Sequence, residues 1–288
     1  MALEVTAPDD ADELRLPPGG SSGSDAAAED DRRELEASDV VSHLHYRTSV
    51  FGESYPFVLR DDAVLELRDL TPERCLYLLL LLAANLKYVR SNADQNKLTT
   101  YFELLSPDVL RGYLGSEARV ELFGTATGEA QEPRYSGALW AKLQGLRDDL
   151  RLKLLVGSGH GEIAPNNHGD RGIDFVAWFP FNDDPADTLV IVLGQCACGR
   201  RPWPKMLEPS EENWKHIFAF PAPVVNVLVI PQCFRRPDGH WYSKAELRSG
   251  VLLDRVRIFE SLRRAGTALP IAPDKLPEAL LEAVIGEP

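Results

Sequence analysis

The pattern of apolar and polar positions divides the chain of 288 residues into an acidic first part and a patterned remainder. Residues 1–40 are rich in Asp, Glu, Ala, Ser, Gly and Pro and hold few large apolar side chains, which is typical of a disordered tail. From Val40 onward, apolar residues recur at the spacings of helices and strands. We therefore expect three parts: a disordered acidic tail (1–40), a mainly helical region (41–117) and an α/β domain (118–288).

The region 41–117 begins with a hairpin pattern. The segment 55–67 (YPFVLRDDAVLEL) has two apolar runs separated by a polar turn, which predicts a β-hairpin. Thr71 and Pro72 predict the start of a helix, because Thr caps helix N-termini and Pro is favoured at the first helical position. The leucine-rich run that follows predicts a core helix that ends near Val89.

A second helical stretch covers residues 98–114. It contains Ser106-Pro107-Asp108, and such a triplet is typical of a fresh helix start. The stretch therefore predicts one or two short helices.

The region 118–288 alternates between strand-like and helix-like segments. The run 188–193 is almost continuously β-branched or leucine, which is typical of a strand buried on both faces. We expect strands over 118–124, 152–156, 173–181, 188–193 and 223–230, and helices over 135–150, 209–220, from 244, over 252–264 and over 277–285. This order predicts an α/β (α+β) fold with a mixed central β-sheet flanked by helices.

Two polar residues lie at the ends of neighbouring apolar strands. Asp174 opens one strand, and Gln195 closes the next in the sequence GQCACG. Burying such groups is costly unless they are bonded, so proteins usually keep them for a site. Because residues two apart on a strand share a face, Gln195 and Ala197 are expected on one face, and Cys196 and Cys198 on the other.

The segments GIDFVAW and GQCACGRRPWPK resemble the PD-(D/E)xK nuclease superfamily, and within it a group of bacterial restriction-like proteins. In that superfamily, an Asp on one strand and an acid-x-Lys pair on the next bind magnesium and cut a phosphodiester. The resemblance covers roughly residues 118–234 and places Asp174 as the first acid, Gln195 at the second acid and Ala197 at the Lys. Two of the three positions depart from the motif. The resemblance implies a restriction-endonuclease-like core with a helical N-terminal part.

The resemblance also implies a DNA endonuclease that depends on Mg²⁺ (or Mn²⁺) and acts in bacterial antiviral defence. A protein partner, an ATPase or a recognition subunit, would supply binding and control. Asp174 would bind the metal, Gln195 would be a second ligand or orienting group, and Lys205 would be a displaced catalytic lysine. Asp170 or Glu162, just upstream, would restore the missing acid, because magnesium needs one or two carboxylates beside the substrate phosphate.

The departures from the motif leave two other interpretations open. The chain would be a non-catalytic, nuclease-like subunit that assembles a complex or binds nucleic acid. Alternatively, it would be a zinc-stabilised binding module. The zinc ligands would then come from Cys196, Cys198 and Cys233 with His160 or His168. The C-x-C spacing fits common zinc sites poorly, and buried free thiols fit it better.

The net charge of −13 is concentrated at the start of the chain. Twelve acids and three arginines give residues 1–40 a charge of −9, so the other 248 residues carry −4. A mildly acidic body argues against a free-standing, high-affinity DNA binder but permits a locally basic groove. The basic residues expected to contact nucleic acid are Arg200, Arg201, Lys215, Arg235 and Arg236.

The chain shows no membrane signal. Its longest apolar run, Leu76–Ala84, is too short to span a bilayer, and its first residues lack the pattern of a signal peptide. We therefore expect a cytoplasmic protein without membrane contact, and a homo-oligomeric state stays open.

Overall fold

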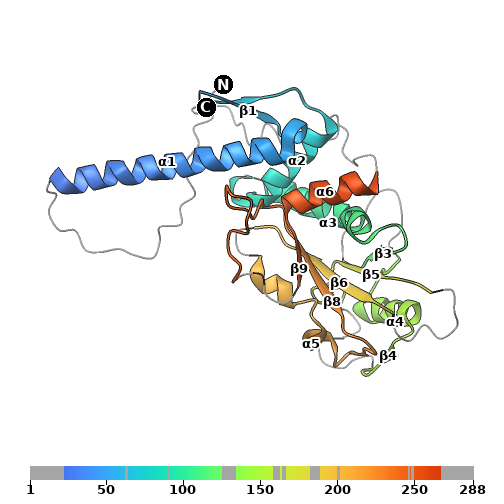
Figure 1. The fold of residues 1–288 in the computed structure, drawn as a ribbon. Coiled ribbons are helices and arrows are strands. Elements are labelled where there is room, and N and C mark those ends of the chain that lie inside the picture. The colour runs from blue at the N-terminus through green and yellow to red at the C-terminus, as the bar shows by residue number, and fades with distance from the viewer. Residues whose placement is uncertain are drawn as a thin grey trace.

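In the computed structural model, a mixed five-stranded β-sheet lies at the centre of the chain (Figure 1). Its strands, in spatial order, are β3 (Arg119–Leu122), β5 (Phe175–Trp178), β6 (Ile191–Cys196), β8 (Val225–Val229) and β9 (Val251–Leu253). β3, β5 and β6 form an antiparallel meander, whereas β8 and β9 continue parallel to β6. The structure describes residues 23–61, 64–89, 91–124, 134–157, 163, 167–181, 189–199, 202–245, 247 and 250–266, with the backbone alone for 23–34 and 203.

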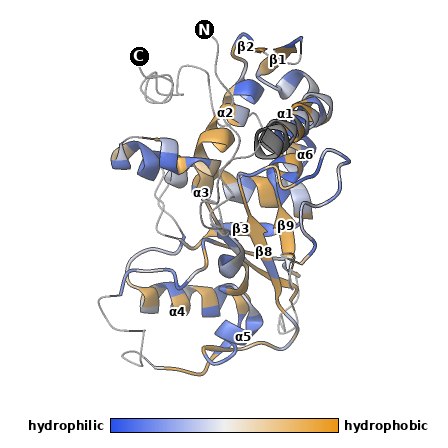
Figure 2. Ribbon diagram, turned by 90° about the vertical axis from the view of Figure 1, so that its left-hand side faces the viewer, coloured by the Kyte–Doolittle hydropathy of each residue, from blue (hydrophilic) through white to orange (hydrophobic). Residues whose placement is uncertain are grey.

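Helices cover both faces of the sheet, which confirms the predicted α/β class. One face packs against α2 (Pro72–Ala84), α3 (Asn92–Leu114) and α6 (Arg255–Ala265). The other face packs against α4 (Leu139–Leu150). Figure 1 shows α3 and α6 on one side of the strands and α4 on the other, and Figure 2 shows the apolar residues concentrated between these layers.

The alternation of side chains along β6 agrees with the prediction. Cys196 and Cys198 pack against the core under α2, α3 and α6. Leu193 faces α4, and Ala197 belongs to a smaller core with Met206 and Leu228. Gln195 therefore lies on the opposite face from the two cysteines.

The N-terminal part differs from its expectation. Helix α1 runs from Gly23 to Phe51, so the assignment of residues 1–40 to a disordered tail is wrong for 23–40. Residues 1–22 lie outside the described residues. The stretch 23–40 contains three consecutive alanines with several Glu and Arg, which are strong helix formers, so local propensity outweighs the acidic composition. Figure 1 shows α1 projecting from the helices that cover the sheet, and Leu35 on it is 76% exposed.

The expected hairpin is present as β1 (Phe57–Arg60) and β2 (Val64–Leu67), with Phe57 opposite Leu67. It connects the short 3₁₀ turn η1 (Gly52–Ser54), which follows α1, to the start of α2.

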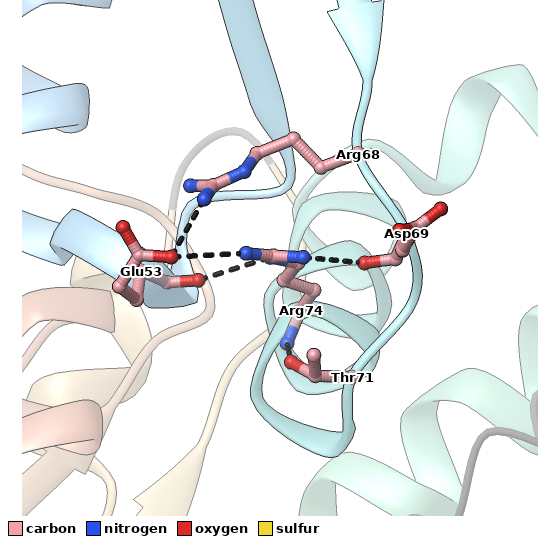
Figure 3. A network of polar contacts seen from close by, with 5 residues as sticks. All are labelled: Glu53, Arg68, Asp69, Thr71 and Arg74. Atoms are coloured by element: carbon pink, nitrogen blue, oxygen red, sulfur yellow. Dashed lines mark hydrogen bonds and ion pairs between the residues drawn. The ribbon is translucent and has the colours of Figure 1, made fainter.

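Arg74 fastens the start of α2 to the chain before it (Figure 3). Its peptide N–H donates to Thr71 Oγ1 at 3.4 Å, so the predicted cap is confirmed. Its guanidinium donates to the carbonyl oxygens of Glu53 at 3.0 Å and Asp69 at 2.7 Å. Arg68 and Arg74 also share the Glu53 carboxylate. These bonds hold the hairpin against the helical layer. Helix α2 ends at Ala84, and η2 (Leu86–Tyr88) follows it.

Helix α3 continues through Pro107, so the predicted fresh start at Ser106 is wrong. A proline in a helix removes the hydrogen bond to the carbonyl four residues earlier, which here belongs to Glu103. Ser106 Oγ donates to that carbonyl at 2.6 Å. The serine therefore satisfies the carbonyl that the proline leaves unbonded, and the helix persists.

The segment after β6 contains less helix than expected. It forms η3 (Trp203–Leu207) and a single turn, α5 (Glu211–Trp214), where a helix over 209–220 was predicted. β7 (Phe218–Ala219) then pairs with β4 (Lys153–Leu154). The indole of Trp214 is fully buried and stacks on Phe218 with ring centroids 6.3 Å apart. This packing and the strand pairing outweigh the helical period.

The last described segment forms a strand and a helix, where only a helix was predicted. The helix predicted over 252–264 is α6, which begins at Arg255 because Asp254 caps it, and the residues before Asp254 form β9. The helix predicted from 244 is absent from the described residues of that stretch, and the one over 277–285 lies outside them. Among the described helices, none has the length and apolar character needed to cross a membrane.

Candidate functional site

Asp174 connects three strands at one end of the sheet. Its peptide N–H donates to Gly194 O at 2.9 Å, and its carbonyl accepts from the N–H groups of Phe123 at 2.8 Å and Gly124 at 2.9 Å. Its carboxylate accepts from Cys196 N at 2.6 Å. The side chain therefore lies where β5 and β6 separate, next to Gln195, as the predicted hairpin requires.

Negative charges outweigh positive charges around Asp174. The pKa of Asp174 is raised to about 8, chiefly by burial and also by the carboxylates of Glu103 and Asp170. The Cys196 N–H and the ammonium of Lys205 lower the pKa, but less than the other groups raise it. A carboxyl group in such surroundings is poised to bind a proton or a cation at neutral pH.

Glu103 reaches this site from α3. A methyl group built on Gly124 would lie 2.0 Å from Glu103 Oε1 and 3.3 Å from Asp174 Cα, so the carboxylate occupies the space beside the Asp174 backbone. Sequence reasoning missed Glu103. The available signal was an acid between Phe102 and the Leu104-Leu105 pair of a core helix.

Gln195 is 4% exposed, and only one end of its amide is bonded among the described residues. Nε2 donates to Glu208 Oε2 at 2.6 Å. Oε1 is buried without a hydrogen-bond partner. Most buried polar atoms are satisfied, so this acceptor is a candidate for a ligand contact. Sequence reasoning also missed Glu208.

Lys142 is a third residue that the sequence did not indicate. It lies on α4, is 3% exposed, and its ammonium donates to the carbonyls of Phe123 at 3.2 Å, Gly124 at 3.3 Å and Gly169 at 3.5 Å. Burial lowers the pKa of Lys142, whereas Asp170 and Glu103 raise it. The ammonium holds together the two loops that flank Asp174.

The predicted metal ligands are only partly described. Asp170 lies near Asp174 and accepts from Gly172 N at 2.9 Å. Lys205 is an exposed residue of η3 whose charge acts on Asp174. Glu162 lies outside the described residues. The structure therefore brings Asp170, Asp174, Gln195 and Lys205 to one end of the sheet.

The predicted nucleic-acid contacts are scattered. Arg200 and Arg201 lie outside the described residues. Lys215 pairs with Glu212 at 2.7 Å on the surface. Arg236 is 59% exposed, whereas Arg235 is bonded to the buried Asp254, its Nε lying 3.0 Å from Oδ2. Arg235 also lies 3.5 Å from the ring centre of Trp241, so its surroundings are those of a packing residue.

The cysteines are free thiols. Burial raises the pKa of Cys198 to about 12 and also raises the pKa of Cys196 and Cys233, so their thiols stay protonated. Among the described residues, which exclude His160, no group of three or more His, Cys, Asp or Glu side chains is arranged to hold a metal. The zinc interpretation therefore lacks a ligand set in this part of the chain.

Comparison with known proteins adds one distant likeness. No protein family and no curated protein matches the chain. A solved structure, the MspJI restriction endonuclease in complex with a 27-mer oligonucleotide, matches with 18% identity and a TM-score of 0.29. The match covers 68% of this chain and 33% of the MspJI chain, so this chain spans about a third of the length of that protein.

Proposed function

We propose that the chain is a nuclease that uses Mg²⁺ or Mn²⁺ to hydrolyse phosphodiester bonds in DNA, with its centre at Asp174 and Gln195. The observation that carries the proposal is the pairing of these two buried residues. One is a carboxyl group whose pKa is raised to about 8, and the other presents an acceptor, Oε1, that lacks a partner among the described residues.

Both features suit a hard divalent cation. Mg²⁺ prefers oxygen ligands, keeps several waters, and needs one or two carboxylates beside the substrate. Asp174 and Gln195 Oε1 would hold it, and Glu103 and Asp170 would add negative charge around it. When bound, the ion would activate a water molecule and neutralise charge on the phosphate.

The cations of the chain would have separate tasks. Lys205 is exposed near Asp174 and would contact the substrate phosphate, as a displaced counterpart of the lysine that Ala197 replaces. Lys142 is saturated by three carbonyls, so it would position the backbone beside Asp174 and not touch the substrate.

DNA binding would depend on exposed basic residues and on a partner. Lys215 and Arg236 are exposed in the structure, and Arg200 and Arg201 are further candidates. The body of the chain carries a charge of only −4 outside residues 1–40, so it would bind DNA weakly by itself. A partner subunit, an ATPase or a recognition protein of a bacterial defence system, would then deliver the substrate.

A second candidate is a non-catalytic subunit that keeps the fold for assembly. Two contacts favour it. Asp174 Oδ2 is bonded to Cys196 N, where the β5–β6 pairing ends, and the Gln195 amide is bonded to Glu208. Under this interpretation, both residues serve the sheet and no ion is needed.

A cleavage assay separates the two candidates. Linear, supercoiled and single-stranded DNA would be incubated with Mg²⁺ or Mn²⁺ and with wild-type, Asp174→Asn or Asp148→Asn protein. Asp148 is an exposed acid of α4 that pairs with Arg147, so its variant controls for the loss of one negative charge. Cleavage by wild type and D148N but not by D174N supports the nuclease. Absence of cleavage by all three, with and without cell extract that supplies partners, supports the subunit.

A further inference from the structure

Gln195 stands where the motif has its second acid. A carboxylate from another segment lies next to it. Glu208 follows η3, thirteen residues after Gln195. Its Oε2 accepts from Gln195 Nε2 at 2.6 Å. The amide of Gln195 therefore ends on a carboxylate that also lies against Gly172, two residues before Asp174.

The surrounding chain fixes Glu208 in this place. A methyl group on Gly172 would lie 2.6 Å from Glu208 Oε2 and 2.7 Å from Glu208 Cβ, so the glycine leaves room for the acid. The φ of +78° at Gly172 also disfavours a larger residue. From the other side, Trp214, which is fully buried, donates from Nε1 to Glu208 O at 3.1 Å.

The orientation of the Gln195 amide adds an independent observation. Because Nε2 is directed to Glu208, Oε1 is the atom left for another partner, and it has none among the described residues. Gln195 is 4% exposed, so bulk water does not readily satisfy this acceptor. A neutral amide that presents an unpartnered oxygen next to a carboxylate is an arrangement that a divalent cation completes.

We propose that Glu208 is the second acid of the metal centre, and that its carboxylate and Gln195 Oε1 bind a divalent cation together with Asp174. The inference rests on the proposed function. It explains how a chain with Gln in place of the second motif acid keeps two carboxylates for the ion. The negative charge has moved from the strand to the segment after η3, and Gln195 holds it there by a hydrogen bond.

The competing explanation is that Glu208 only orients the Gln195 amide. The variant Glu208→Gln separates the two, because it keeps an oxygen that accepts from Gln195 Nε2 but removes the charge. A charge-relocation variant, Q195E/E208Q, returns the acid to the strand. Glu212 lies on the same segment, is 77% exposed and pairs with Lys215, so Glu212→Gln is the matched control.

Mn²⁺ binding to the full chain, measured by electron paramagnetic resonance and calorimetry, tests the proposal. E208Q should bind Mn²⁺ about 10- to 100-fold more weakly than wild type, the loss typical of removing a group that supports a metal. Q195E/E208Q should recover most of the affinity, and E212Q should match wild type. Circular dichroism would show that each variant is folded.

Different failures have different meanings. Wild-type affinity in E208Q, together with lost binding in D174N, overturns the role of Glu208 and leaves the nuclease proposal standing. Absence of Mn²⁺ binding by the wild type overturns both. If E208Q does not fold, Glu208→Asp replaces it, since it keeps the charge but shortens its reach. Weaker Mn²⁺ binding by the folded E208D then supports the proposal, and unchanged binding overturns it.

Discussion

The carboxylate of Asp174 accepts a hydrogen bond of 2.6 Å from the peptide N–H of Cys196. The bond favours the ionised carboxyl group, yet burial together with Glu103 and Asp170 outweighs it, and the pKa stands at about 8. Asp174 therefore takes part in the sheet and is electrostatically costly at the same time, which is typical of residues kept for function.

The raised pKa predicts how stability depends on pH. In the unfolded chain the pKa of Asp174 lies near 3.8 and in the folded chain near 8, so the folded state binds its proton more tightly. The contribution of Asp174 to stability is fully present below pH 4 and is lost as pH rises towards 8. We expect D174N to gain free energy of unfolding relative to wild type between pH 5 and pH 8, measured by urea denaturation. Each unit of difference between the folded and unfolded pKa values corresponds to about 1.4 kcal/mol. Even part of the Asp174 shift therefore gives a measurable difference in the free energy of unfolding.

The surface variant D148N is the control for this experiment. Its difference from wild type should stay constant across the same pH range, because Asp148 is 65% exposed. Parallel pH curves for D174N and wild type would show that the Asp174 carboxyl group titrates normally.

A bound divalent cation should offset the free-energy cost of ionising Asp174 in its buried, negatively charged surroundings. A ligand that binds only the folded state stabilises it by about 2.7 kcal/mol at 100 times its Kd. We expect Mn²⁺ or Mg²⁺ to raise the melting temperature of the wild type at pH 8, and excess EDTA to reverse this. D174N should show a much smaller rise. An equal rise in both proteins would place the ion elsewhere.

The strands were predictable because each carries its own signal. The run 188–193 is β-branched and apolar on both faces, and β6 (Ile191–Cys196) is indeed buried on both sides over most of its length. The neighbouring strands at 173–181 and 223–230 were found in the same way, although β5 and β8 are shorter than predicted. The adjacency of Asp174 and Gln195 then followed from the hairpin alone.

The wrong secondary-structure predictions involve interactions that cannot be inferred from the local sequence pattern. Pro107 normally ends a helix, but the hydroxyl of Ser106 takes over the carbonyl that the proline leaves unbonded. The helix expected over 209–220 gives way to β7, because β4, more than 60 residues earlier, offers a strand partner. Each outcome depends on a neighbour that the sequence pattern does not reveal.

The site shows the same limit. Asp174 and Gln195 share one hairpin, whereas Glu103, Lys142 and Glu208 come from α3, α4 and the segment after η3. A single acid in a helix or after a turn has an ordinary surface role in most proteins. Only the packing of these elements at the sheet end separates these three residues from other Glu and Lys residues.

The adjacent residues Arg235 and Arg236 should differ sharply when mutated. Arg235 pairs with Asp254, whose side chain is fully buried, whereas Arg236 is 59% exposed. Removing one partner of a buried pair costs about 3–5 kcal/mol, because the other charge is left uncompensated. We expect R235A to lose stability on this scale, and R236A to stay within about 0.5 kcal/mol of wild type. Chemical denaturation measures both.

The same pair tests the role of Arg236 in DNA binding. If Arg236 contacts phosphate, R236A should weaken DNA binding and reduce its salt dependence by about one counterion. R235A, compared at a temperature where it remains folded, should change the salt dependence less. Equal stability of R235A and R236A would contradict the structural role of Arg235.

Lys142 should stabilise the backbone around the site. Lys142 is 3% exposed, and its ammonium donates to three carbonyl oxygens, those of Phe123, Gly124 and Gly169. Met has a similar length but no donor, so Lys142→Met leaves these acceptors unbonded at a cost of about 1–3 kcal/mol for each group that stays buried. We expect K142M to unfold at clearly lower urea concentration than wild type, whereas K153M, at an exposed position of β4, should not. Because Gly124 also bonds Asp174 O, K142M should weaken Mn²⁺ binding even where it remains folded. Unchanged stability of K142M would contradict the structural role of Lys142.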